Sequence, residues 1–422
     1  MIQFFYEAIM SLGVYLIEFI LLLRRLRGKE DLMRLNERRG VTKLSRPRGA
    51  LIWLHASSVG ESIASLTLID KLLKTLPNYN ILVTTGSVSS ARLLKERLPE
   101  CVIHQFVPID RKLWIQRFLN HWQPNLAIIM ESEFWPTQIK QLKKRNTPIL
   151  VINGRLSESS YSRWRLAGSM TRTIFGNLDL VLATNDQQAK RFSNLRAPYV
   201  QVVGNLKRSA PKLPLDADSA QDLIKQVGSR PVWLAASTHE GEDLPILKTQ
   251  KKLLIQFPNM LAIIVPRHPK RGIDIEFLAQ KNGLSVARRN KSEKIKPETE
   301  LYIADTMGEM SLFYNVAHCV FVAGSLVPVG GHNPIEPAHF NCAIFFGPLM
   351  AKNQEISEEM IEKNAAIQID TIENLTPTLE KVFSDDDLFQ SLSYNAQKYA
   401  ENGGGILETI STKISPYIKK ID

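Results

Sequence analysis

The chain has 422 residues, of which 44% are hydrophobic and 23% are charged. This length exceeds one ordinary hydrophobic core, so we expect two domains, and the composition is that of a globular protein. The three cysteines are far apart and form no CxxC pair, which argues against a disulfide framework or a zinc site and fits a reducing compartment. They are Cys101, Cys319 and Cys342.

Charge is unevenly distributed along the chain. Residues 1–210 contain 31 Lys and Arg against 15 Asp and Glu, a net charge of +16, whereas residues 211–422 contain 22 against 27, a net charge of −5. A cationic amino-terminal half predicts an anionic partner, with a membrane surface and nucleic acid as candidates and a merely soluble basic surface as the alternative. The aromatic and basic residues do not interleave as in a nucleic-acid module, so we expect no nucleic-acid partner.

The amino terminus favours the membrane. Ile2 to Leu23 is a mostly apolar segment of 22 residues that precedes four basic residues, so we expect residues 1–30 to form a membrane anchor helix with the remaining chain on the cytoplasmic side. Glu7 and Glu18 would share one face of that helix, which also suits an interfacial anchor or a helix docked on the protein itself. The segment lacks the basic start and the A-x-A site of a cleaved signal peptide.

Short apolar runs alternate with helical patterns after the anchor. Strands separated by helices predict βαβ units and a parallel sheet, so we expect a Rossmann-like domain over residues 31–205. The expected strands are Leu51–Leu54, Ile81–Thr85, Val102–Val107, Leu126–Met130, Ile149–Ile152, Leu178–Ala183 and Val200–Val203.

The first strand is followed by His55–Ser62, in which small residues, a glycine and one carboxylate precede a helical pattern. Open α/β sheets bind their ligands at this edge, so Glu61 is a candidate for chemistry. Ser58-x-x-Glu61 also fits a capping box, in which both side chains satisfy free backbone N–H groups. The spacing alone favours the cap.

Other strand ends in the first half carry charged residues. Glu131 and Glu133 follow one strand and suggest a helix cap or a metal pair, although no histidine or third carboxylate lies near in the sequence. Arg155 follows the next strand. Lys207 lies in the expected linker, Asn205–Asp218, where it could reach a cleft between domains or remain a solvated charge.

The pattern then restarts, which predicts a second Rossmann-like domain over residues 206–390. The segment 391–422 is expected to be helical, with a break at Gly403–Gly405, and to cross back to the first domain. The expected strands are Val232–Ala235, Leu261–Val265, Leu284–Ala287, Leu301–Ile303, Cys319–Val322 and Ala343–Phe346, and the linker prolines are Pro211 and Pro214.

Four loops of the second half predict a nucleotide site. Ser237 and Thr238 present hydroxyls suited to a phosphate or a helix cap, and Arg267 stands between two prolines with a guanidinium that suits a phosphate or carboxylate. Asp305–Met310 opens a helix whose free N–H groups suit an anion, while Glu309 would favour a sugar hydroxyl or base edge. In the loop Gly324–Pro337, the glycines allow close approach, Asn333 would cap a helix beginning at Pro334, and Glu336 could accept ribose hydroxyls.

Seven segments together resemble the 3-deoxy-D-manno-octulosonic acid (Kdo) transferases of Gram-negative bacteria. The match runs in order from the hydrophobic amino terminus almost to the end of the chain, and seven ordered motifs are specific where each alone is weak. The segments are His55–Glu61, Met130–Pro136, Gly204–Lys207, Ala236–Glu242, Pro266–Arg267, Asp305–Met310 and Gly330–Pro337.

The resemblance implies a GT-B glycosyltransferase, with two Rossmann-like domains facing across a cleft, on the cytoplasmic side of the inner membrane. It implies transfer of Kdo from CMP-Kdo to lipid IVA, the bisphosphorylated lipid A precursor, in lipopolysaccharide biosynthesis, with no metal or cofactor. By position, Glu61 matches the catalytic base, and Glu131 and Lys207 match residues that stabilise the transition state. The CMP-binding positions match Pro266, Arg267, Gly308, Glu309, Met310, Asn333, Pro334, Ile335 and Glu336.

The chemistry agrees with these roles. A sugar hydroxyl needs a base as it attacks the anomeric carbon, and Glu61 can take that proton. Charge on the leaving CMP phosphate can be met by Lys207, Arg267 and helix N-termini, so a metal is not required, and direct displacement inverts the anomeric centre. Two alternatives remain open, namely a GT-B-like enzyme acting on a soluble nucleotide sugar, such as an epimerase, and a non-catalytic protein that binds anionic lipid or nucleic acid.

Overall fold

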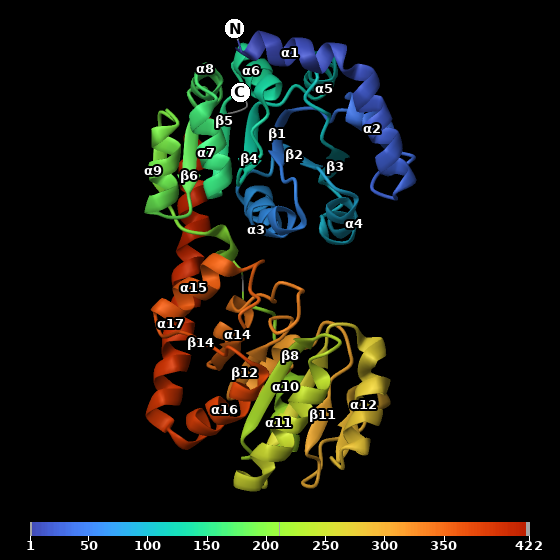
Figure 1. Ribbon diagram of the computed structural model, residues 1–422, viewed down its shortest axis with the longest axis vertical. Helices are drawn as coiled ribbons and strands as arrows, with labels where there is room; N and C mark the ends of the chain where they lie inside the picture. The colour runs from blue at the N-terminus through green and yellow to red at the C-terminus, as the bar shows by residue number, and fades with distance from the viewer. Residues whose placement is uncertain (1, 211, 419–422) are drawn as a thin grey trace. The chain divides into compact units, whose positions relative to one another are not determined.

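The structure is a computed structural model that describes residues 2–210 and 212–418, with side chains from residue 6 onward. The chain divides into two compact units (Figure 1). Unit 1 comprises residues 1–209 and 405–422, and unit 2 comprises residues 210–404. The boundaries expected from the sequence were 205/206 and 390/391. Pro211 of the expected linker and residues 419–422 of the expected carboxyl-terminal segment lie outside the described residues.

Unit 1 contains a parallel sheet with the order β3-β2-β1-β4-β5-β6-β7 among the described residues. The seven apolar runs predicted for this half each form a strand, some with ends shifted by one or two residues. The strand order reverses between β1 and β4, and ligands of such sheets bind at the carboxyl ends of the strands on either side of the reversal. The strands are β1 (Ala50–His55), β2 (Tyr79–Thr85), β3 (Ile103–Phe106), β4 (Leu126–Met130), β5 (Ile149–Gly154), β6 (Leu180–Ala183) and β7 (Val200–Val202).

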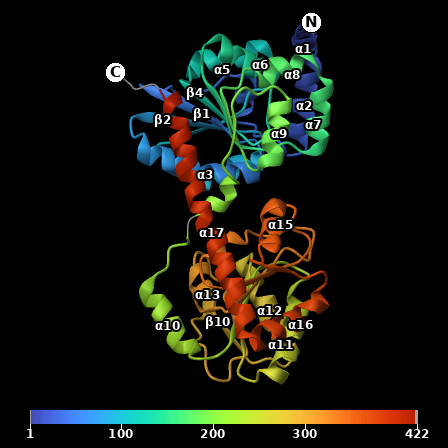
Figure 2. The ribbon, with the colours of Figure 1, turned by 90° about the vertical axis from the view of Figure 1, so that its left-hand side faces the viewer.

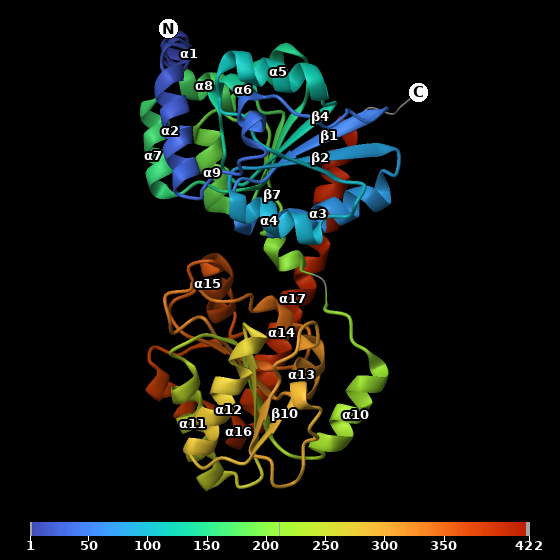
Figure 3. The ribbon, with the colours of Figure 1, turned by 90° about the vertical axis from the view of Figure 1, so that its right-hand side faces the viewer.

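Helices cover both faces of this sheet, which is why its strands are apolar on both sides. Helix α3 and the end of α17 (Asp386–Ile414) lie on one face, and α5, α6, α8 and α9 lie on the other (Figures 2 and 3). Buried side chains of each group form a hydrophobic cluster with the sheet. The helices of unit 1 are α1 (Ile2–Leu12), α2 (Val14–Leu26), α3 (Val59–Thr75), α4 (Val88–Arg97), α5 (Lys112–Trp122), α6 (Pro136–Lys144), α7 (Glu158–Leu166), α8 (Ser169–Phe175) and α9 (Asp186–Asn194).

The expectation of one anchor helix over residues 1–30 is wrong, because α1 and α2 are separate helices that meet at Gly13. No single helix in the described part of the chain is long and apolar enough to cross a membrane. Tyr6–Leu12 and Val14–Leu26 satisfy the length and composition requirements only as a pair bent by 65°. A β-carbon at residue 13 would lie 2.9 Å from the Ile9 carbonyl oxygen, so glycine suits this bend.

Polar contacts hold both amino-terminal helices on unit 1. The Tyr6 hydroxyl donates a hydrogen bond to Asp110 (3.0 Å), and Glu7 pairs with Lys140. Glu18 on α2 accepts two hydrogen bonds from Arg39, at 2.6 and 2.8 Å. The two acids therefore do not share one face of a single helix, and each is neutralised by a cation of the protein.

Unit 2 has a second parallel sheet, with the order β10-β11-β9-β8-β12-β13-β14 among the described residues. Its order reverses between β8 and β12. The six expected strands are present, and the short strand β14 was not predicted. The strands are β8 (Val232–Thr238), β9 (Leu261–Pro266), β10 (Val286–Arg288), β11 (Leu301–Ile303), β12 (Cys319–Val322), β13 (Ala343–Phe346) and β14 (Ile367–Gln368). The helices are α10 (Ala217–Val227), α11 (Asp243–Gln256), α12 (Gly272–Lys281), α13 (Met310–Val316), α14 (Ile335–Ala338), α15 (Gln354–Glu362), α16 (Leu375–Ser384) and α17 (Asp386–Ile414).

Helix α17, red in Figure 2, continues without interruption through Gly403–Gly405, so the expected break is absent. A glycine inside a helix costs about 1 kcal/mol relative to alanine. Here the flanking turns are held by burial, because Tyr399 and Ala400 pack in the core of unit 2 while Ile406 and Ile410 pack in that of unit 1. Tertiary packing therefore overrides the local propensity of the glycines.

Candidate active site

Glu61 lies in the first turn of α3, directly after β1, and its carboxylate folds back on the start of its own helix. Oε2 accepts a hydrogen bond from the Ser57 backbone N–H (2.7 Å), and Oε1 accepts one from the Ser58 hydroxyl (2.9 Å). The Ser58 hydroxyl oxygen in turn accepts the Glu61 N–H at 3.3 Å. Ser58 thus caps α3 as predicted, while the reciprocal bond of Glu61 goes to the N–H of Ser57, one residue before the N-cap.

The protonation equilibrium of Glu61 is nevertheless unlike that of an ordinary cap. Burial, followed by the negative charge of Glu131, raises the pKa of Glu61 from 4.5 to about 7, although the hydrogen bonds from Ser58 and Ser57 oppose the shift. A carboxylate with a pKa near neutrality both accepts protons effectively and is substantially ionised at physiological pH. Each carboxylate oxygen can accept more than one hydrogen bond, so the cap leaves room for a substrate proton.

Glu131 and Lys207 meet on the other side of the strand reversal. Glu131 follows β4 with a left-handed backbone (φ 56°), and its Oε1 lies 3.5 Å from the Lys207 ammonium nitrogen. Its Oε2 lies 3.0 Å from Nε of Arg155, which follows β5. Glu131 therefore pairs with cations from two other segments of unit 1. Lys207 belongs to the short 3₁₀ helix η2 (Leu206–Ser209), which contacts α3, and a β-carbon at Gly60 would lie 3.7 Å from its ammonium nitrogen.

The three residues matched to catalytic positions therefore lie at one edge of one sheet. This arrangement does not favour the metal pair suggested by Glu131 and Glu133, because Arg155 and Lys207 already compensate the Glu131 carboxylate. Arg155 was only a weak candidate in the sequence. Its place after the strand next to β4 was the available signal, since neighbouring parallel strands end at the same edge.

The buried Arg38 is linked through Gly86 to Ser57, whose N–H binds Glu61. Arg38 pairs with Glu30 (3.0 Å) and donates a hydrogen bond to the Gly86 carbonyl oxygen (2.7 Å). The Gly86 N–H donates to the Ser57 carbonyl oxygen (3.1 Å), and Ser57 is the residue whose N–H binds Glu61. These contacts were not predictable from the sequence, because they join residues that are distant in the chain.

In unit 2, the loops after β8 and β12 meet at the strand reversal and are joined by the buried Glu242. Its carboxylate accepts backbone N–H bonds from Gly324 (2.9 Å), Leu326 (3.3 Å) and His239 (3.0 Å). His239 and His332 lie with their rings nearly parallel and their Nε2 atoms 2.9 Å apart. Burial lowers the pKa of His332 to about 4, aided by the charge of His239.

Of the two hydroxyl residues predicted to bind a phosphate, Ser237 and Thr238, one is already used inside the protein. Thr238 is buried and its hydroxyl donates to Asp243 (3.0 Å), so it serves the start of α11. Ser237 is half-buried and has a left-handed backbone (φ 63°). Arg267 is exposed immediately after Pro266, and its backbone N–H donates to the Thr238 carbonyl oxygen (3.0 Å), which keeps the ends of β8 and β9 together.

The two remaining CMP-matched segments also lie at the carboxyl ends of strands, after β11 and β12. Glu309 pairs with Arg289 (2.5 Å) and accepts a bond from the Thr306 hydroxyl, so its carboxylate is already engaged. Gly308 is exposed and has a left-handed backbone (φ 83°). The peptide groups of Gly308 are therefore accessible to a ligand beside Glu309 and Met310.

Helix α14 differs slightly from the prediction. It begins at Ile335 rather than Pro334, and Pro334 is its N-cap. Asn333 still accepts the Ile335 N–H through its side chain (3.1 Å), which places the half-buried Glu336 in the first turn.

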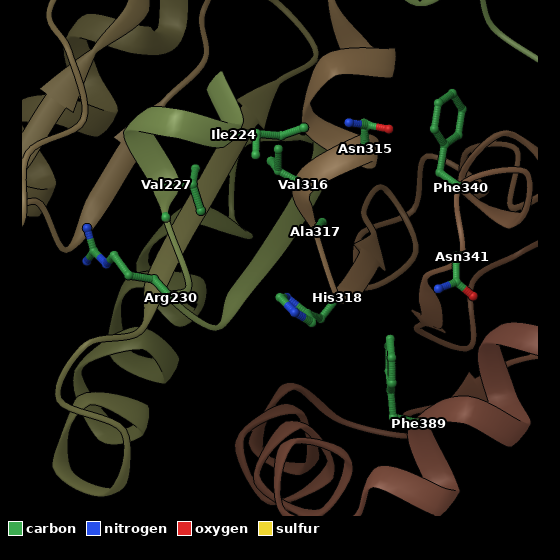
Figure 4. Close-up of a pocket in the computed structure, with 11 residues that line it drawn as sticks. Ile224, Val227, Arg230, Asn315, Val316, Ala317, His318, Phe340, Asn341 and Phe389 are labelled. Carbon is green, nitrogen blue, oxygen red and sulfur yellow. The ribbon is translucent and has the colours of Figure 1, made fainter. Parts of the chain in front are cut away.

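A cavity in unit 2 lies at the opposite edge of the sheet. A cavity of about 480 Å³ lies beside the amino ends of β8, β12 and β13 (Figure 4). Its lining includes Arg230, His318, Asn341 and Phe389. Since ligands of doubly wound sheets bind at the carboxyl ends, we do not assign the nucleotide to this cavity.

Comparison with known proteins identifies the family of this chain. A family model described as 3-deoxy-D-manno-octulosonic-acid transferase (kdotransferase) matches residues 33–210. The 3-deoxy-D-manno-octulosonic acid transferase of Rickettsia bellii is 34% identical over 421 residues, covering 98% of this chain and 99% of its own. The transferase of the same name from Haemophilus influenzae is 32% identical and covers 99% of both chains.

Solved structures support the fold. Acinetobacter baumannii MurG matches with a TM-score of 0.56 at 11% identity, covering 86% of this chain and 99% of its own. The complex of Staphylococcus aureus MnaA with UDP matches with a TM-score of 0.55 at 14% identity, covering 87% and 96%. Two parallel-sheet α/β domains of the GT-B class are thus shared. Near full-length identity above 30% establishes that the chain belongs to the 3-deoxy-D-manno-octulosonic acid transferase family.

Proposed function

We propose that this protein is an inverting glycosyltransferase that moves Kdo from CMP-Kdo to lipid IVA in lipopolysaccharide biosynthesis, with Glu61 as the general base. The observation that carries the proposal is the Glu61 carboxylate, whose pKa is raised to about 7 at the strand reversal that also holds Glu131 and Lys207. Family membership supports Kdo as the transferred sugar.

The proposed reaction is a single displacement. The Glu61 carboxylate takes the proton of the acceptor hydroxyl while the hydroxyl oxygen forms a bond to the anomeric carbon of Kdo. The bond from that carbon to the CMP phosphate oxygen breaks, and its electron pair leaves with CMP. Lys207, held by Glu131, stabilises charge that develops in the transition state. The rate should therefore rise with pH until Glu61 is ionised.

We assign CMP recognition to unit 2. Arg267 suits the phosphate because its guanidinium is exposed at a strand end. Gly308–Met310 offers exposed backbone groups beside the Glu309 carboxylate, which is already paired with Arg289. We assign this segment to the cytosine base of CMP. We assign ribose recognition to Asn333–Glu336, because Glu336 lies in the first turn of α14 and a carboxylate can accept hydrogen bonds from hydroxyls.

We propose that α1 and α2 bind the cytoplasmic surface of the inner membrane, where lipid IVA would be presented. Large apolar side chains remain exposed on these helices, among them Leu12, Tyr15 and Phe19, and the exposed Arg25 and Arg27 follow them. An amphipathic surface of this kind binds anionic lipid interfaces.

Vesicle flotation with phosphatidylglycerol-containing liposomes tests the membrane assignment. Phe19→Glu should reduce the bound fraction, whereas Ile255→Glu, at an exposed apolar residue of unit 2, is the matched control. Equal binding by both variants would remove the assignment of the membrane surface to α1 and α2.

The reaction is tested by incubating the purified protein with CMP-Kdo and lipid IVA and analysing the lipid by mass spectrometry. A mass increase of one or more Kdo residues supports the proposal and counts the sugars. Transfer only to a water-soluble acceptor would reject lipid IVA, and release of CMP without a glycosylated product would reject transfer.

A further inference from the structure

Asn153 occupies an unusual position beside the proposed catalytic group. It lies near the end of β5, where the pairing with β6 shifts register between Ile152 and Gly154. Its backbone is left-handed (φ 59°), and the residue is fully buried, with 0% exposure. Asparagine tolerates the left-handed region better than most residues, so the local backbone alone permits Asn153 but does not explain its burial.

Both ends of the Asn153 amide are used. Its Nδ2 donates a hydrogen bond to Glu131 Oε1 (3.4 Å), and its Oδ1 accepts the backbone N–H of Leu206 (2.8 Å). Leu206 precedes Lys207, whose ammonium nitrogen lies 3.5 Å from the same Glu131 oxygen. Asn153 therefore closes a ring that joins the loop after β4 to the helix that carries Lys207.

From this geometry we infer that Asn153 is a positioning residue, which fixes Lys207 against Glu131 and thereby sets the charge that acts on Glu61. The inference rests on the proposed function. The amide is suited to this role because it donates to a carboxylate and accepts from a backbone N–H at once. An aspartate of similar shape lacks the donor and would place a second carboxylate beside Glu131.

Two variants separate the amide from the backbone. Asn153→Asp retains the shape, and Asn153→Gly permits the same φ while removing the side chain. Both should lower kcat by about 10²-fold, because a misplaced catalytic group costs that much. Both variants should move the acidic limb of the kcat/KM profile to higher pH, because Asn153→Gly loosens Lys207 from Glu131 and Asn153→Asp also adds negative charge beside Glu131. Asn146→Asp is the matched control, since Asn146 is exposed and also left-handed (φ 55°) in the same unit.

A second measurement does not require activity. Lys207 is labelled with an acylating reagent and the extent is read by peptide mass spectrometry, with circular dichroism checking that each variant is folded. Asn153→Gly should label several-fold faster than wild type and Asn146→Asp, because the segment before Lys207 loses its anchor to Oδ1.

Unchanged Lys207 labelling in folded Asn153→Gly would overturn the inference whether or not the protein transfers Kdo. Wild-type kcat in either Asn153 variant, or an unmoved acidic limb in Asn153→Asp, would also overturn it. Absence of transfer by the wild-type protein would instead reject the proposed function, and the labelling result would still decide the role of Asn153.

Discussion

Replacing Glu61 by glutamine should stabilise unit 1 while abolishing most of the activity. The folded protein holds Glu61 at 7% exposure and raises its pKa from 4.5 to about 7. A folded pKa above the unfolded value means that the folded state retains the proton longer, so this group makes wild-type stability fall as pH rises from about 4.5 to about 7. Each pKa unit corresponds to about 1.4 kcal/mol, so the ionised carboxylate costs about 3 kcal/mol above pH 7.

Glutamine removes this cost without removing the cap. A capping box accepts Glu or Gln at this position, so the side-chain carbonyl oxygen of the introduced glutamine can still accept a hydrogen bond. Glu61→Ala also loses the hydrogen bonds from the Ser57 N–H and the Ser58 hydroxyl, and a lost hydrogen bond costs about 1 kcal/mol of stability. If Glu61 is the base, both substitutions should lower kcat by about 10²- to 10⁴-fold, the usual contribution of a general base.

The assay is urea unfolding of the wild type and both variants at pH 5 and pH 8, together with transfer kinetics. Tryptophan fluorescence reports mainly unit 1, because five of the six tryptophans belong to it. These are Trp53, Trp114, Trp122, Trp135 and Trp164. Glu61→Gln should gain stability over wild type at pH 8 and little at pH 5.

Two results would refute this reasoning. Equal stability differences between Glu61→Gln and wild type at pH 5 and pH 8 would show that burial does not disfavour the carboxylate. Full activity in Glu61→Gln combined with loss in Glu61→Ala would assign Glu61 to capping alone.

Two substitutions test the surroundings of the site, and one labelling experiment tests the burial of the cysteines. Lys207→Met should lower kcat by about 10²- to 10³-fold with little change in the dissociation constant for CMP, measured by calorimetry, because the lost interaction acts on the transition state. Arg38→Met should destabilise unit 1 by about 1–3 kcal/mol in urea unfolding, because Glu30 keeps only the more exposed Arg24 (2.7 Å) as its ion-pair partner and the Gly86 carbonyl loses a donor, and retention of wild-type stability would contradict this role. A thiol reagent should modify one cysteine of the native protein, the exposed Cys101, and three after denaturation, with more than one in the native state refuting the burial of the other two.

Most strands of the two sheets could be predicted from the sequence, because parallel strands that are covered on both faces are continuous apolar runs. The same reasoning failed at the amino terminus. There the apolar run is long enough for one helix, but Gly13 and the contacts of Tyr6 and Glu18 with distant residues divide it into two. The composition of the apolar segment does not predict its contacts with distant residues.

The candidate residues of the site could be predicted where they lie soon after a strand, as Glu61 and Glu131 do. Glu131 and Lys207 are far apart in sequence, and their pairing follows from a left-handed turn and a short 3₁₀ helix that no periodicity indicates. The availability of individual side chains was harder to foresee. Glu309 was expected to face a ligand, but Arg289, which comes from another strand end, already engages it.

Capping and proton transfer place compatible demands on Glu61. Hydrogen bonds from Ser57 and Ser58 fix its rotamer and favour the ionised form, while burial and Glu131 favour the protonated form. Without the cap, a buried carboxylate beside Glu131 would resist ionisation more strongly and would be poorly oriented. Without burial, it would be a weak base. A pKa near 7 requires both, so the capping box is a condition for the proposed catalysis rather than an alternative to it.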